Sequence, residues 1–234
     1  MHKIFFYHMP KAGGTSINSA LKNTFDVSCI APLIENDSVG HQIHSGQYRS
    51  FRGFDFYSGH YGTDIFDAVA DGHISLSNFR HPVTRIYSLY RYFRGIEVSA
   101  HDLSQRQYAA VRRAKDACFA DFVATDDEAV SIYISDQQAR QLTGSPWALQ
   151  KEIDTNAAKA RIDQLAWFYV CEQPEASLAW LGEVLGIYSI PVLNVTPQTS
   201  VSEELKACED TILERNQIDL ALYKYAMDRL NSGV

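Results

Sequence analysis

The chain has 234 residues, enough for one sizeable hydrophobic core. Its 46% hydrophobic and 21% charged residues are typical of a globular protein and exclude a disordered chain. The formal net charge of -7 argues against a broad nucleic-acid-binding surface, so an anionic ligand would need a local cluster of arginine and lysine. No apolar stretch approaches the length of a membrane span and no secretory pattern opens the chain, so we expect a cytoplasmic protein.

The first predicted elements are a buried strand, a polar turn and a helix. Ile4, Phe5 and Phe6 form an apolar run typical of a strand, and apolar residues from Ile17 to Phe25 recur at helical spacing. Between them lies Tyr7-His8-Met9-Pro10-Lys11-Ala12-Gly13-Gly14-Thr15-Ser16. Its glycines let the backbone approach a ligand, and the helix N-terminus, a lysine and two hydroxyls favour an anion. A phosphate-binding turn is therefore one interpretation; a purely structural glycine turn before a helix is the other.

The residue order in this turn differs from the nucleotide-triphosphate loop G-x-x-x-x-G-K-[ST], because Lys11 precedes Gly13. The order Pro-Lys-x-Gly-Gly-Thr-Ser resembles the 5′-phosphosulfate loop of sulfotransferases that use 3′-phosphoadenosine 5′-phosphosulfate (PAPS). The likeness is greatest to the branch related to heparan-sulfate 2-O-sulfotransferases and other carbohydrate sulfotransferases. The resemblance implies a binding loop made of Lys11, Ala12, Gly13, Gly14, Thr15 and Ser16.

No metal site is expected from the histidines and cysteines. His41 and His44 form an H-x-x-H pattern in an irregular stretch, where no third ligand is obvious and solvent-facing loop histidines are favoured. The cysteines form no C-x-x-C pair, so free buried thiols are favoured over a zinc ribbon or a disulfide framework. These cysteines are Cys29, Cys118, Cys171 and Cys208.

A second strand is predicted at 54–58, followed by Gly59-His60-Tyr61-Gly62. The flanking glycines would allow the chain to bend sharply and project His60 from the end of the strand. A lone histidine is more often a packed or surface residue. Members of the sulfotransferase family commonly have a Gly-His pair at this distance after the phosphosulfate loop, so the resemblance implies that His60 is the catalytic base.

A third strand is predicted at 73–79, and Pro82 then opens a helix to about Phe93. The helical spacing predicts a solvated surface for Arg91 and Arg94, and puts Arg85 on the same side, away from the apolar face. Arg80 differs because it ends a strand, where open α/β sheets bind ligands.

The stretch from Phe79 to Tyr90 resembles the family's 3′-phosphate motif, F-R-x-P-x-x-R-x-x-S-x-Y. The resemblance implies that Arg80 and Ser88 bind the 3′-phosphate. Arginine suits this role because its planar fork matches phosphate oxygens, and a serine hydroxyl adds a donor. His81 departs from the family, in which many members have aspartate at this position.

The rest of the chain predicts helices around one further strand. A polar helical insertion at about 99–130 is expected on the acceptor side. The helix at 135–142 resembles a family element, Gln-Ala-Arg-x-Leu-x-Gly; its Arg140 is a weaker candidate for a substrate contact than for an ordinary surface charge. A strand at 167–171 and a helix from Pro174 to Gly186 follow. An extended piece at 190–195, a ligand loop at 196–200 and helices at 202–215 and 217–230 complete the prediction.

These features together predict an α/β fold: a P-loop-containing three-layer sandwich in which helices flank a largely parallel sheet, as one domain over 1–234. The resemblance implies a sulfotransferase that moves a sulfuryl group from PAPS to a hydroxyl of a carbohydrate or small molecule and leaves 3′,5′-ADP. Lys11 and His60 would be catalytic, and no metal, nucleic acid or membrane would be required. A P-loop kinase or nucleotide hydrolase is the first alternative, although Asn78-Phe79-Arg80 lacks the acidic residue that holds magnesium in such enzymes. A nucleotide-binding module without catalytic activity is the second.

Overall fold

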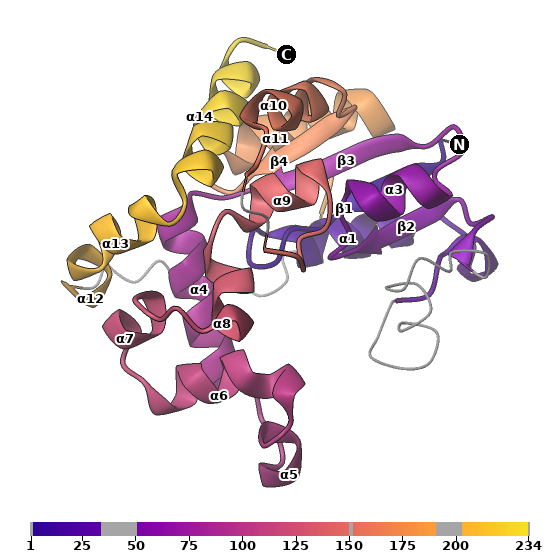
Figure 1. The fold of residues 1–234 in the computed structure, drawn as a ribbon. Helices are drawn as coiled ribbons and strands as arrows, with labels where there is room; N and C mark the ends of the chain where they lie inside the picture. The colour runs from indigo at the N-terminus through magenta and orange to yellow at the C-terminus, as the bar shows by residue number, and fades with distance from the viewer. Residues whose placement is uncertain (1, 34–50, 150–151, 191–202, 234) are drawn as a thin grey trace.

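The computed structural model describes residues 2–33, 51–149, 152–190 and 203–233. Its centre is a parallel sheet of β1 (Ile4–Tyr7), β2 (Phe56–Gly59), β3 (Ile74–Phe79) and β4 (Trp167–Val170), in the order β2-β1-β3-β4 (Figure 1). Phe6 pairs with Ser58 on one side and Leu76 on the other, so the strands are in register. Since all four run the same way, their carboxyl ends share one edge.

Helices cover both faces of the sheet, so strand residues on both faces are buried, including the serines of β2 and β3. Phe5, Tyr7 and Tyr57 pack toward α3 (Thr63–Val69), α9 (Gln137–Thr143), α10 (Thr155–Asp163) and α14 (Gln217–Asn231). Ile4, Phe6 and Leu76 pack toward α1 (Gly14–Lys22) and α11 (Pro174–Leu185). The predicted α/β fold with a parallel sheet flanked by helices is therefore confirmed.

A second hydrophobic core lies beside the sheet, around α4 (Pro82–Gly95). Figure 1 shows α4 leading away from the sheet, with α6, α7 and α8 beside it and α5 beyond α6. The helices here are α5 (Ala100–Leu103), α6 (Ala109–Asp116), α7 (Phe119–Val123), α8 (Glu128–Ile134), α12 (Glu203–Ala207) and α13 (Glu209–Glu214), with short 3₁₀ turns at Val27–Cys29 and Arg106–Tyr108 elsewhere in the described chain. The prediction of a single helix at 202–215 is wrong, because the helix is interrupted at Cys208, between α12 and α13.

Arg85 and Arg140 were expected at a helix surface, but both are buried. Arg85 is fully buried, since helices pack on α4 from more than one side; its guanidinium donates to Gln137 Oε1 at 3.1 Å and to the Tyr133 carbonyl at 3.1 Å. Arg140 is 2% exposed and donates to the carbonyls of Ser135 and Pro146. Both guanidinium groups bind acceptors in the protein interior. Arg140 is therefore neither a surface charge nor an accessible substrate contact.

The N-termini of α9 and α14 bind each other's first turn. Asp219 is fully buried and accepts from the backbone amides of Ala139 at 2.8 Å and Gln138 at 3.2 Å. Asp136, the residue before α9, accepts from the Asp219 amide at 2.8 Å. Each carboxylate satisfies amides that a helix start leaves unpaired. Burial raises the pKa of Asp136 to about 6, and burial also raises the pKa of Asp219 above its ordinary range.

Further predictions concern the cysteines, membrane spans and stretches outside the described part of the chain. The cysteines are free thiols, but only Cys208 is buried and Cys118 is exposed. In the described part of the chain, no helix is both long enough and apolar enough to cross a membrane. The H-x-x-H pattern of His41 and His44, and the ligand loop expected at 196–200, lie outside the described residues.

Candidate functional site

Three turns meet at the carboxyl edge of the sheet, and each carries one of the predicted site residues. Lys11 follows β1, His60 follows β2 and Arg80 follows β3. The chain passes from β1 to β2 on one side and then crosses to β3 on the other, so β1 and β3 flank the point where the strand order reverses. Open α/β sheets bind ligands in the crevice at such a point.

The two turns predicted to bind phosphate are in direct contact. Arg80 Nη1 donates to the Lys11 carbonyl at 3.0 Å, and Arg80 Nε donates to Thr84 Oγ1 at 3.1 Å. Lys11 has a left-handed backbone with φ 64°. That conformation costs a non-glycine residue roughly 1–2 kcal/mol, so the bond to its carbonyl helps to hold the turn. The fold thus brings together two turns whose contacting residues are 69 positions apart in the chain.

Lys11 and Arg80 form a small positive cluster on an acidic protein. Burial lowers the pKa of Lys11, and the neighbouring Arg80 lowers it further. Lys11 Nζ lies 4.2 Å from the ring centroid of Tyr92 on α4. The ion pairs found among the described residues involve neither Lys11 nor Arg80. Within the described residues these neighbouring cations have no carboxylate in an ion pair, which favours an anion near them.

The Asn78 side chain binds the backbone of the turn that follows β1. It is fully buried at the end of β3; its Oδ1 accepts from the Met9 amide at 2.8 Å, and its Nδ2 donates to the carbonyls of Met9 at 3.0 Å and Ala12 at 2.7 Å. The sequence interpretation gave Asn78 no binding or positioning role. Its only signal was a polar residue inside an apolar strand.

Glycine is required at position 13 by the backbone conformation and at position 14 by the surrounding space. Gly13 has φ 77° and precedes α1, and a Cβ added at Gly14 would lie 2.2 Å from the His8 ring. Thr15 is exposed and Ser16 half-buried in the first turn of α1. The backbone from Ala12 to Ser16 therefore turns directly into a helix N-terminus, which favours negative charge.

Ser88 lies on α4, one turn beyond Thr84. Thr84, Ser88 and Tyr92 recur every four residues and so share one helix face. That face begins at the Arg80 contact and ends beneath Lys11. Ser88 is half-buried, and within the described ranges no hydrogen bond joins its hydroxyl to Arg80. The structure thus puts Ser88 on the expected face without a direct bond to the arginine.

His60 lies beside a second histidine that the sequence interpretation gave no role. The His60 and His8 ring centroids are 5.2 Å apart in an edge-to-face arrangement. Burial is the main cause that lowers the pKa of His8 to about 3, with His60 next. Desolvation by the surrounding protein lowers the pKa of His60, although the residue is exposed. Both rings are therefore unprotonated at neutral pH.

Aromatic rings form a continuous series from Lys11 to His60. Tyr92 lies beneath Lys11 Nζ and contacts Phe93, with ring centroids 6.1 Å apart. Phe93 contacts Tyr133 at 5.2 Å, and Tyr133 contacts Trp147 at 5.6 Å. Trp147 lies 6.1 Å from the His60 ring. The element around Arg140 was noted in the sequence, but Trp147 just beyond it, rather than Arg140, reaches the site.

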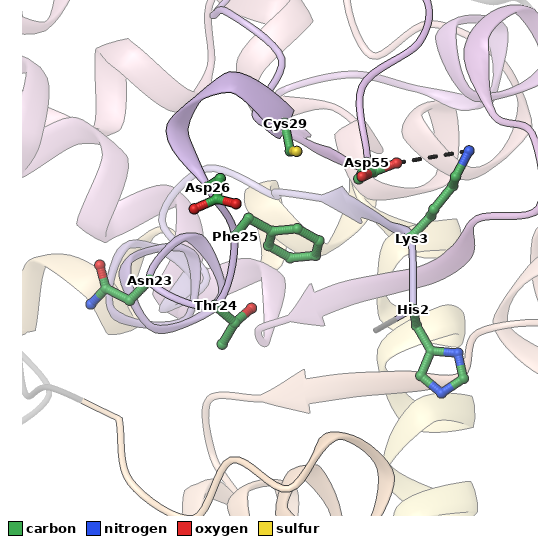
Figure 2. A pocket seen from close by; sticks show the side chains of 8 residues that line it. All are labelled: His2, Lys3, Asn23, Thr24, Phe25, Asp26, Cys29 and Asp55. Atoms are coloured by element: carbon green, nitrogen blue, oxygen red, sulfur yellow. Dashed lines mark ion pairs between the residues drawn. The ribbon is translucent and has the colours of Figure 1, made fainter.

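A separate cavity of about 420 Å³ opens at the amino ends of the strands, opposite the site. Figure 2 shows its lining, in which Lys3 and Asp55 form an ion pair at 3.8 Å beside the end of α1. No predicted site residue lines this cavity. We therefore assign the candidate site by its side chains at the carboxyl edge and not by this hollow.

Comparisons with known proteins do not assign the chain to a family. No family model matches it, and no curated protein matches it either. In the described residues, no group of three or more histidine, cysteine, aspartate or glutamate side chains could hold a metal ion. The geometry at the carboxyl edge, with the sequence motifs that it brings together, is what a functional proposal can use.

Proposed function

We propose that the protein is a PAPS-dependent sulfotransferase that transfers a sulfuryl group to a hydroxyl of a carbohydrate or small molecule. The observation that carries the proposal is the 3.0 Å contact between Arg80 Nη1 and the Lys11 carbonyl. It joins a turn that resembles a phosphosulfate loop to a strand end that resembles a 3′-phosphate motif. Side chains suited to two phosphate groups of one adenosine thus meet at one point of the sheet edge.

The residues present fit such a ligand. Lys11 and the amides from Ala12 to Ser16 would hold the 5′-phosphosulfate as a P-loop does, because the glycines bring the backbone close and the helix start is electropositive. Arg80 and Ser88 would hold the 3′-phosphate. An anion there would also relieve the repulsion by which Arg80 lowers the pKa of Lys11. Local charge therefore favours the ligand even though the whole chain carries -7.

The catalytic roles follow from charge and protonation. PAPS would supply the sulfuryl group, whose bond to the bridging phosphate oxygen breaks as a bond to the acceptor oxygen forms. Lys11 and the amides of the turn would stabilise the charge that develops on the bridging oxygen. His60, unprotonated at neutral pH because its surroundings lower its pKa, would take the proton from the acceptor hydroxyl.

The surroundings favour a neutral acceptor with a flat apolar face. The rings of Tyr133 and Trp147 lie in the series between Lys11 and His60, and sugars and phenols pack well on such rings. The net charge of -7 disfavours a long polyanionic chain. A neutral sugar or a small phenol is therefore the acceptor to test first.

Calorimetric titration tests the nucleotide. We expect 3′,5′-ADP to bind without magnesium and more tightly than ATP. Magnesium-dependent binding of ATP in its place would contradict the proposal and favour a kinase or nucleotide hydrolase. Binding of neither nucleotide would also overturn it.

Radiolabelled PAPS with a panel of neutral sugars and phenols tests the reaction. We expect transfer by the native protein, and His60→Ala should abolish most of the turnover while it leaves 3′,5′-ADP affinity unchanged. His101→Ala, an exposed histidine on α5, serves as the matched control and should behave as the native protein. A near-normal rate in His60→Ala would remove His60 from the mechanism, and 3′,5′-ADP binding without any transfer would favour an inactive nucleotide-binding module.

A further inference from the structure

The turn that carries His60 is bound to the end of α9 by three hydrogen bonds. Trp147 Nε1 donates to the His60 carbonyl at 3.0 Å, and Gln141 Nε2 donates to the Tyr61 carbonyl at 2.8 Å. The amide of Asp64, at the start of α3, donates to the Gly144 carbonyl at 3.4 Å. Successive residues of the turn are therefore anchored to one stretch, Gln141 to Trp147, which we call the α9 segment.

The backbone of the turn packs tightly against the backbone of the α9 segment. A Cβ added at Gly62 would lie 1.8 Å from the Gly144 carbonyl oxygen, closer than any real contact. The backbones can approach this closely only because residue 62 is glycine. A change in the α9 segment should therefore move the turn, and His60 with it.

The α9 segment is itself held firmly. Arg140, 2% exposed, donates to the Pro146 carbonyl at 3.1 Å, directly before Trp147. At the other end of α9, Asp219 binds the amides of the first turn. Buried, charge-assisted hydrogen bonds thus hold both the start of α9 and the residue before Trp147, and such bonds are stronger than those between neutral groups.

Trp147 makes two different contacts with His60. Its indole N–H binds the backbone carbonyl, while its ring lies 6.1 Å from the imidazole at an interplanar angle of 60°. Tyr133 also packs against the same indole, with ring centroids 5.6 Å apart. The imidazole is thus bounded by Trp147 and by His8 from the β1–α1 turn.

We propose that Trp147 is a positioning residue for His60, and that the α9 segment sets where the imidazole points relative to Lys11. This inference rests on the proposed function for its catalytic meaning. General-base catalysis needs the base within hydrogen-bond reach of the hydroxyl, and a displacement of about 1 Å can cost on the order of 100-fold in rate. Trp147 would act on the proton transfer through His60; the packing of its ring on the acceptor is a separate contact, which a variant that keeps an aromatic ring retains.

The decisive variant is Trp147→Phe, which keeps an aromatic ring and removes the N–H donor. We expect kcat to fall roughly 10-fold to 100-fold, while the affinity for 3′,5′-ADP stays within about twofold because Lys11, Ser88 and Arg80 are untouched. Trp180→Phe is the matched control: Trp180 is also partly buried, but it packs on Trp167 and Phe168 in the core. The control should retain the native kcat.

The pH profile separates positioning from a general loss of structure. A loosened turn lets more water reach His60, so the acid limb of kcat/KM should move to higher pH, toward the ordinary value of imidazole. The described titratable groups that bear on the turn are His8, which contacts the ring, and Asp64, whose side chain bonds Ser145; both are kept in the variant. A kcat within twofold of native and an unmoved acid limb would overturn the inference.

A readout without turnover keeps this inference distinct from the proposed function. Proton NMR titration of the His60 ring should show a higher pKa in Trp147→Phe than in the native protein, and the control should show none of this change. If the native protein transfers no sulfate, the proposed function fails while the NMR titration still decides the positioning role. If Trp147→Phe does not fold, Gln141→Met removes the neighbouring donor to Tyr61 and should move His60 in the same direction. An unchanged His60 titration in a folded Gln141→Met protein would then refute the positioning role.

Discussion

Asn78→Asp tests the support beneath the candidate phosphate-binding turn. The substitution keeps the shape of the side chain and an acceptor for the Met9 amide, but replaces the donor that binds the carbonyls of Met9 and Ala12. Two buried carbonyls lose their partner, and each such group costs roughly 1–3 kcal/mol. We therefore expect the free energy of unfolding to fall by about 3 kcal/mol at neutral pH, a large part of the roughly 5–15 kcal/mol that stabilises a domain.

The loss should depend on pH. Burial next to two carbonyl oxygens raises the folded-state pKa of the introduced carboxyl above its unfolded value of about 3.9. The protonated form can donate one bond, so the penalty is smallest below the unfolded pKa and grows as pH rises through the folded pKa. Urea unfolding at pH 5 and pH 7.5, followed by tryptophan fluorescence and compared with the native protein at each pH, measures this difference.

Asn156→Asp is the control for this experiment. Asn156 is exposed in the first turn of α10, where an added negative charge is tolerated, so its unfolding free energy should stay within about 0.5 kcal/mol of native. Asn78→Asp should also weaken 3′,5′-ADP binding, because the turn loses its shape. A folded Asn78→Asp protein that matches the native stability at both pH values would refute the view that Asn78 supports the turn.

The remaining predictions concern the pH dependence, the phosphate-binding arginine and the glycine turn. Because the surroundings of His60 lower its pKa, transfer should persist below pH 6.5 and decline only as pH falls through the lowered value; kcat/KM measured from pH 4 to 8 checks this. Arg80→Lys removes the planar fork and should weaken 3′,5′-ADP binding about 10-fold or more by calorimetry. Gly14→Ala should lower the free energy of unfolding by about 1–3 kcal/mol, because its Cβ would collide with the His8 ring.

Each of these three predictions is checked by a control variant or by a result that would contradict it. An acid limb at or above pH 6.5 would contradict the lowered pKa. Arg91→Lys changes an exposed arginine on α4 and should leave nucleotide affinity unchanged; equal losses in both variants would point to general charge rather than to Arg80. Gly95→Ala, at a position with open space in the last turn of α4, should be neutral or slightly stabilising.

Local pattern was sufficient for most of the secondary structure. Pro82 at the start of α4, and Pro174 with Gly186 at the two ends of α11, act within a few residues of the boundaries that they set. The four strands lie within about two residues of the apolar and alternating runs that predicted them. The helix predicted at 202–215 was wrong because the break at Cys208 has no glycine or proline to mark it.

Spacing along a helix could not show what packs on it. Arg85 was expected at a surface because it lies off the apolar face of α4, yet Gln137 and the Tyr133 carbonyl bind it in the interior. The same holds for Arg140, whose partners are carbonyls beyond both ends of α9. The acceptors of Arg85 lie 48 and 52 residues away, and those of Arg140 lie within 8 residues but outside its helix, so helical spacing shows neither set.

The sequence alone determined the strands, most of the helices and the two motifs that suggest phosphate binding, since each depends on residues close together in the chain. Only the tertiary structure decided that Lys11 and Arg80 meet, that Asn78 supports the turn and that Trp147 borders His60. The reason is the strand order: β1 lies between β2 and β3, so the turns that follow these three strands converge at one edge although long stretches of chain separate them.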